Sequence, residues 1–95
     1  MTKLTGQFIN QAGQPLIGRA EIELDRATID ATTGKQVIPC RQLVPLNDQG
    51  AFEVELWPNA RGEEESHYRL TVARISLRFS LPDEPEVDLA DVAEL

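Results

Sequence analysis

The sequence predicts an all-β protein, a small antiparallel β-sandwich of about six or seven strands. Two observations lead to this prediction. Short runs of alternating apolar and polar residues recur along the chain, and turn clusters rich in Gly, Asn and Pro at residues 10–15 and 47–50 separate them. Each such strand has only one apolar face, so a second sheet must cover it. A partly open barrel is the alternative that the same pattern allows.

The first part of the chain predicts two regular strands followed by a loop. The first strand covers residues 3–9, and the second covers residues 19–25, where the alternation is strict. The buried face of the second strand should consist of Ala20, Ile22 and Leu24. Residues 26–36 are polar and without lasting periodicity, so we expect a loop there.

Prolines interrupt the next segment, residues 37–45. Pro39 and Pro45 each lack the N–H group that a central strand needs, so this strand should lie at a sheet edge or be broken by a bulge. Clean alternation returns at residues 52–57. A polar loop over residues 59–66 follows it.

The last apolar runs, residues 68–72 and 75–81, occupy opposite parities in the sequence. A one-residue slip sends side chains to the wrong face of a sheet, so Ala73 and Arg74 must absorb it. Two interpretations remain open: one strand bent by a bulge, or two strands joined as a hairpin.

The C-terminal residues stand out by their charge. Six acidic residues and no basic residue follow Pro82. We therefore expect one β-sandwich domain over residues 1–82 and an acidic extension over residues 83–95. A short helical turn, capped by Asp88, should dock this extension through three apolar residues, Leu89, Val92 and Leu95.

Charge disfavours a nucleic-acid partner. The net charge is −7, and it divides into +1 for residues 1–45 and −8 for residues 46–95. Such a surface repels a phosphate backbone. The acidic segment is better suited to contact with a basic protein surface.

Cysteine content and hydropathy indicate a soluble protein made in the cytoplasm. Cys40 is the only cysteine of the sequence, so an intramolecular disulfide is impossible. Residues 1–6 lack the basic and apolar regions of a secretory leader, and no stretch reaches the roughly 20 apolar residues of a membrane span. We expect no membrane insertion.

The chemically reactive residues form no recognisable catalytic or metal-binding pattern. His67 and Cys40 are single residues from separate strands, and a metal site recruits several such ligands. Ser66 and His67 are adjacent, so in a strand they point to opposite faces. Glu63, Glu64 and Glu65 lack the spacing of a calcium loop. We expect no cofactor, no metal and no enzymatic activity.

Trp57 is the most informative candidate for binding. Strict alternation places it on the same, solvent-facing side as Glu53 and Glu55. An exposed Trp beside carboxylates stacks on a sugar ring or sits in a protein interface. The competing interpretation is that Trp57 folds over the end of the sandwich beside Pro58.

Two motifs resemble those of a known family. The segment Gly50-Ala-Phe-Glu-Val-Glu-Leu-Trp57-Pro-Asn59 and the segment Ser66-His-Tyr68-Arg-Leu70 resemble the small β-sandwich modules of bacteriophage or prophage tail fibres, tail spikes and minor tail proteins. The first half alone is also similar to carboxypeptidase-regulatory and transthyretin-like modules, and the expected sandwich is of the transthyretin-like or Ig-like kind. The chain departs from the family at Ala73-Arg74, where a Gly-containing turn is usual.

This resemblance implies a virion component located in the phage tail, which joins tail parts or attaches the phage to its host without catalysis. It also implies partners among other tail proteins, or copies of the chain itself arranged as a homotrimer. If copies associate, the expected surfaces are exposed strand edges at residues 37–45 or 3–9 and the acidic extension.

A second hypothesis is a carbohydrate-binding module that recognises a host surface glycan. Trp57 and Tyr68 would serve as stacking platforms. Their hydrogen-bonding partners would be Asn59, Glu53 and Glu55. An enzyme would instead need a cleft that gathers His67 with at least two acids, which this sequence gives no reason to expect.

Overall fold

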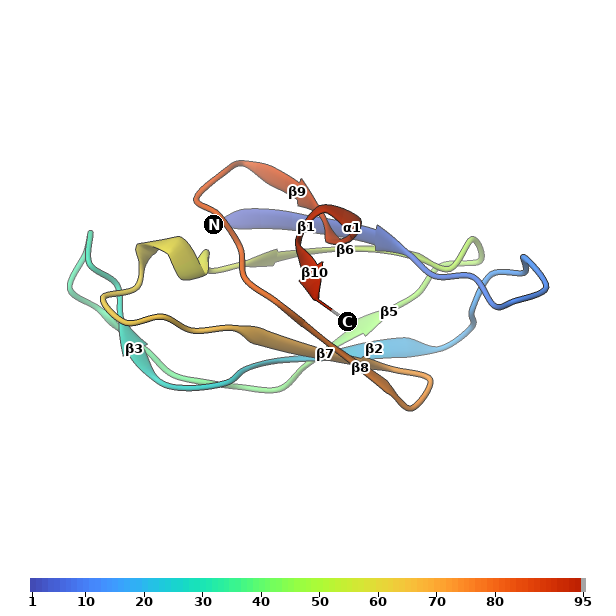
Figure 1. Ribbon diagram of the computed structural model, residues 1–95, viewed down its shortest axis with the longest axis horizontal. Coiled ribbons are helices and arrows are strands. Elements are labelled where there is room, and N and C mark those ends of the chain that lie inside the picture. The colour runs from blue at the N-terminus through green and yellow to red at the C-terminus, as the bar shows by residue number, and fades with distance from the viewer. Residues whose placement is uncertain (95) are drawn as a thin grey trace.

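Two sheets packed face to face form the fold in the computed structural model, which describes residues 1–94 (Figure 1). The smaller sheet has the order β6-β1-β9. Its strands are β1 (Thr2–Gln7), β6 (Ala51–Leu56) and β9 (Glu86–Asp88). The larger sheet has the order β10-β8-β7-β2-β5. Its strands are β2 (Arg19–Leu24), β5 (Gln42–Pro45), β7 (Tyr68–Val72), β8 (Ile75–Phe79) and β10 (Ala93–Glu94).

Three short elements complete the described chain. Strands β3 (Thr28–Ile29) and β4 (Gln36–Val37) pair as a separate hairpin at one end of the sandwich. A 3-10 turn, η1 (Asn59–Arg61), follows β6, and one helical turn, α1 (Leu89–Val92), lies between β9 and β10. The all-β prediction is confirmed, and so is the short C-terminal helical turn with its Asp88 cap.

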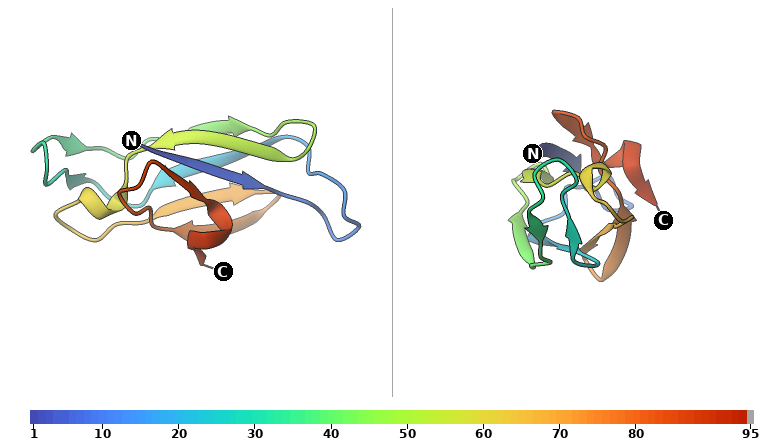
Figure 2. Two further views of the ribbon diagram at one scale, coloured as in Figure 1. Left: turned by 90° about the horizontal axis from the view of Figure 1, so that it is seen from above. Right: turned by 90° about the vertical axis from the view of Figure 1, so that its left-hand side faces the viewer.

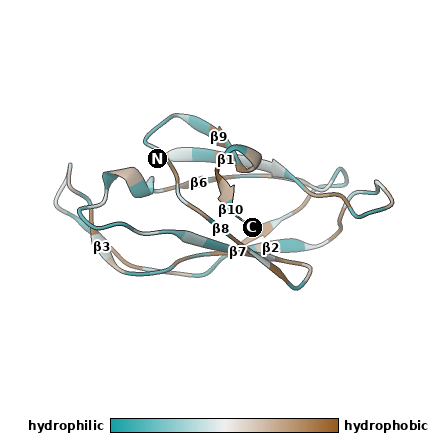
Figure 3. Cartoon of the chain, viewed as in Figure 1, coloured by the Kyte–Doolittle hydropathy of each residue, from teal (hydrophilic) through white to brown (hydrophobic). Residues whose placement is uncertain are grey.

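The core lies between the two sheets, as the end-on view shows (Figure 2). Alternating residues of β1 and β2 are buried in it. Figure 3 shows that the strands carry both hydrophobic and hydrophilic residues. Leu4 from the smaller sheet and Ile22, Leu70 and Phe79 from the larger one have no exposed surface. Burying each of these side chains contributes about 1.5–3 kcal/mol.

Residues 26–45, expected as a loop followed by a broken strand, contain three pieces of strand, because β3 and β4 form a hairpin where the loop was expected and β5 follows it. β4 ends before Pro39, and β5 begins after it as an edge strand of the larger sheet. Leu46 donates its N–H to Gly18 O, which by the antiparallel alternation turns the backbone of Pro45 away from β2. The missing N–H of Pro45 therefore costs no sheet hydrogen bond and blunts this edge.

The phase change after Val72 is a hairpin. β7 and β8 pair antiparallel in a register that sets Val72 opposite Ile75, and only Ala73 and Arg74 lie between them. Both turn residues have positive φ angles, 48° and 69°. This backbone matches the right-handed twist of the flanking strands, although neither residue is the glycine that such turns favour.

The acidic C-terminal segment, expected as an extension of the sandwich, pairs with strands of both sheets. β9 pairs parallel with β1 on one sheet, and β10 pairs antiparallel with β8 on the other. Val87 and Leu89 are buried in the core, whereas the acidic residues around them face solvent. Apolar residues at alternate positions give the segment an inner face despite its charge.

Strand β1 is the centre of its sheet, so it offers no free edge. It pairs with β6 on one side and with β9 on the other. This corrects the expectation that residues 3–9 form an exposed edge for association. Among residues 1–94, no helix has the length and apolar character needed to cross a lipid bilayer.

We predict that Arg74→Gly stabilises the protein by about 1 kcal/mol, because glycine adopts a positive φ without the steric cost that a side chain pays. Urea unfolding followed by the fluorescence of Trp57 measures this change. Arg69→Gly is the matched control: Arg69 lies within β7 and has no positive φ, so the same exchange should destabilise by up to about 1 kcal/mol. A loss of stability in Arg74→Gly would contradict the turn geometry.

Candidate functional site

The indole of Trp57 is anchored at the end of the sandwich that carries the β3–β4 hairpin. Its Nε1 donates a hydrogen bond of 2.8 Å to Asp30 Oδ2. The side chain is half-buried, and it lies close to Gly62, where an added Cβ would sit 3.0 Å from the indole. Only part of the ring is therefore available to a ligand.

Asp30 is the centre of a polar cluster at this end, and it is 4% exposed. Its Oδ1 accepts the N–H groups of Thr32 (2.8 Å) and Thr33 (3.1 Å), and its Oδ2 lies 3.1 Å from the guanidinium of Arg61. The hydrogen bond from Trp57, together with these N–H groups and Arg61, lowers the pKa of the Asp30 carboxyl. This carboxylate thereby joins the hairpin, β6 and η1.

Asn59 is buried and uses both ends of its amide within the protein. Its Nδ2 donates to Ser66 Oγ at 2.9 Å, and its Oδ1 accepts the N–H of Leu81 at 2.8 Å. These bonds join the loop after β6 to the segments before β7 and after β8. Asn59 therefore supports the fold and does not present its amide to a glycan.

Tyr68 is also buried, which corrects the expectation of an exposed stacking platform. Its hydroxyl donates a hydrogen bond of 2.7 Å to Trp57 O, and its ring stacks on Phe79 with the centroids 5.4 Å apart. Burial raises the pKa of the Tyr68 hydroxyl well above its ordinary range.

Trp57 and Glu55 share a groove on the open side of the sandwich, between β5 and β6. The groove has a volume of about 250 Å³, and most of its lining is apolar. Its exposed rim includes Met1, Ile38 and Cys40. Of the five residues proposed for glycan contact, Trp57, Glu55 and the buried Tyr68 line this groove, whereas Glu53 shares a separate depression with Glu55.

Glu53 lies apart from the groove, on the outer face of the smaller sheet. It forms an ion pair with Lys3 at 3.2 Å, and Lys3 also reaches Glu86 at 3.3 Å. The hydrogen bonds to these two carboxylates raise the pKa of the Lys3 ammonium. Lys3 of the central strand β1 therefore links Glu53 on β6 to Glu86 on β9.

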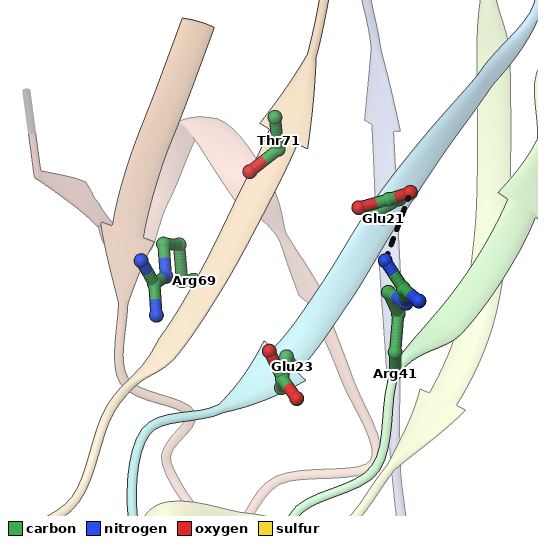
Figure 4. A pocket seen from close by; sticks show the side chains of 5 residues that line it. All are labelled: Glu21, Glu23, Arg41, Arg69 and Thr71. Atoms are coloured by element: carbon green, nitrogen blue, oxygen red, sulfur yellow. Dashed lines mark ion pairs between the residues drawn. The ribbon is translucent and has the colours of Figure 1, made fainter.

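A shallow polar depression covers the outer face of the larger sheet (Figure 4). Its volume is about 510 Å³, and five side chains line it: Glu21, Glu23, Arg41, Arg69 and Thr71. Arg41 and Glu21 approach to 3.9 Å. The alternation of residues 19–25 in the sequence placed the two glutamates on the wet face, but it gave no sign of the arginines beside them.

The predicted docking residues of the C-terminal segment meet their partner within the same chain. Leu89 is buried in the core, and Val92 is half-buried against it. Leu95 lies outside the described residues.

His67 and Cys40 lie in different surroundings. The His67 ring is within 3.8 Å of Asp25 and 3.7 Å of Glu65, whereas Cys40 is exposed on the groove rim. Within residues 1–94, no group of three or more His, Cys, Asp or Glu side chains has the geometry to hold a metal ion.

No protein-family model matches the chain, and no curated protein is significantly similar to it.

We predict that the Asp30 carboxylate makes the stability of the protein depend on acid pH. Its pKa is lower in the folded state than the value of about 3.9 in the unfolded chain. The stabilisation is therefore complete above that value and disappears as the pH falls through the folded-state pKa. Asp30→Asn should be less stable than the native protein at neutral pH, and the difference should shrink toward about pH 2.

Urea unfolding at a series of pH values measures this difference. Asp48→Asn is the matched control, because Asp48 lies in an exposed turn and its removal should leave the pH profile unchanged. A difference between Asp30→Asn and the native protein that stays constant with pH would refute the role of the ionised carboxylate.

Proposed function

We propose that this chain is a non-enzymatic structural module of a bacteriophage or prophage tail, in a tail fibre, a tail spike or a minor tail protein. It acts in tail assembly or host attachment, and it meets other tail proteins or copies of itself. The resemblance of its two motifs to tail modules supports this proposal, and the sandwich has the architecture that the resemblance implies.

The observation that supports the proposal most directly is the presence of exposed apolar side chains at two places on the sandwich. Met1 and Ile38 flank the groove beside Trp57, and Ile9 and Ile17 project from a loop at the opposite end. Grouped apolar side chains on a surface mark sites of protein contact. A module that joins other parts needs such contacts at more than one place.

The turns of the sandwich are stiffened by side-chain hydrogen bonds, which suits a structural spacer. Asn47 Oδ1 accepts the N–H groups of Gln49 and Ala51, and Asn10 Oδ1 does the same for Ala12 and Gln14. An Asn side chain that bonds to its own turn favours one loop conformation over the others.

Electron microscopy of phage particles from the cell that encodes this chain tests the proposal. Antibodies raised against the chain should label the tails of purified particles, and deletion of its gene should give particles with defective tails or impaired adsorption. Intact, infective particles that carry none of this chain would refute the proposal.

Glycan binding remains the second candidate, because Trp57 and Glu55 line one groove. Since Trp57 is the only tryptophan, its fluorescence reports directly on this groove. If the groove binds sugar, titration with host surface polysaccharide should shift the emission. Glu55→Gln should weaken binding about tenfold, because a neutral amide oxygen accepts a weaker hydrogen bond than a carboxylate does. Glu53→Gln, outside the groove, is the matched control. An unchanged emission at saturating polysaccharide would exclude this candidate.

A further inference from the structure

One segment of the surface differs from the rest because it carries no charge. Residues 4–18 contain no Asp, Glu, Lys or Arg, although 26% of all residues are charged. Residues 8–18, the exposed part of this stretch, form an arm. It projects as a loop at one end of the sandwich, opposite the β3–β4 hairpin (Figure 1).

The arm is a two-stranded ribbon with a defined register. Ile9 and Pro15 form an antiparallel bridge, Leu16 donates its N–H to Phe8 O, and Asn10 donates its N–H to Gln14 O. Phe8 also donates its N–H to Gly50 O, which ties the arm to the smaller sheet. Little conformational entropy is therefore left to lose when the arm binds a partner.

The two faces of the arm have different surroundings. Phe8 and Leu16 are half-buried against the core, and the Phe8 ring stacks on Phe52 at 5.7 Å. Residues next to them in each strand point the other way, which puts Ile9, Pro15 and Ile17 on the outer face. Ile9 is 59% exposed and Ile17 is 96% exposed.

The absence of charge on this outer face favours a second copy of the acidic chain as its partner. Two copies of a chain with net charge −7 repel each other, and the repulsion is smallest where the approaching surfaces carry no charge. The arm is that surface, whereas the opposite end of the sandwich carries Glu63, Glu64 and Glu65. The strand edges offer a weaker alternative, because the edge strands β6, β9 and β10 each carry acidic side chains and Pro45 blunts the edge strand β5.

We propose that the arm is a self-association site, at which the outer faces of the arms of two copies pack together around a twofold axis. The same patch serves both copies, as an isologous contact requires. Three side chains from each copy bury less area than the roughly 800 Å² per partner of a standard interface. Association is therefore weak, with a dissociation constant in the micromolar range or above. This inference stands independently of the proposed tail function.

Light scattering coupled to size exclusion tests the site on the whole chain, from about 10 µM to 1 mM, a range chosen for a weak interface. The mass should rise with concentration from 10.6 kDa toward twice that value. Salt should strengthen the association, because it screens the repulsion between acidic copies and leaves the apolar contact intact. A monomer throughout the range, or a mass of three chains, would overturn the twofold arrangement.

Two matched variants separate the arm from other apolar surfaces. Ile17→Asp should weaken dimerisation at least about a hundredfold, since the substitution removes one buried isoleucine from each copy and adds two facing carboxylates. Ile38→Asp makes the same change at an isoleucine that is 64% exposed on the groove, and it should leave dimerisation within about threefold of the native value, the shift expected from added net charge alone. Equal losses in both variants, or no loss in Ile17→Asp, would overturn the proposal. Circular dichroism confirms that each variant is folded.

Discussion

The two sheets hold each other in place by burying their apolar faces, and the other features of the molecule depend on this contact. Leu4 of the smaller sheet and Ile22 and Phe79 of the larger one are completely enclosed. Each sheet has one apolar face, and only the apolar face of the other sheet covers it. The C-terminal segment contributes Val87 and Leu89 to the same core, so its acidic residues are held at the surface in a fixed place.

At the end of the sandwich, where regular strand pairing stops, polar side chains hold the segments together through hydrogen bonds. Asp30 and Asn59 accept backbone N–H groups from segments that no sheet ladder joins. An unpaired N–H in such a place costs about 1–3 kcal/mol. Asn59 meets this requirement for Leu81, and the Tyr68 hydroxyl satisfies the carbonyl of Trp57. Both residues, which the sequence suggested for glycan contact, are therefore committed to the fold, while Trp57 keeps a partly accessible ring.

The surface that remains is divided by charge. Carboxylates surround Lys3 on the outer face of the smaller sheet, acidic and basic residues alternate on the larger sheet, and the arm has neither. The arm and the groove beside Trp57 both carry exposed apolar side chains, and they lie toward opposite ends of a molecule 45 Å long. Leu43 and Ile75 are exposed elsewhere on the larger sheet.

The amino-acid sequence by itself determined the longer strands and their turns, because alternation, Gly, Pro and a capping Asp act over a few residues. It did not predict the short strands β3, β9 and β10. Strand β2, the edge position of β5 and the cap of α1 by Asp88 all follow from such local rules. The hairpin at Ala73-Arg74 was one of two interpretations, since a bulge changes the parity of a strand just as a turn does.

Only the tertiary structure decided which side chains meet. Trp57 binds Asp30 from 27 residues away, and Thr5 meets Asp88 from 83 residues away. A local pattern shows which face of its strand a residue occupies, but not which distant group lies opposite that face. For this reason the surroundings of Trp57 could not be predicted from the sequence, and the acidic segment was expected to be an extension. In the structure, the apolar residues of that segment are buried between the sheets.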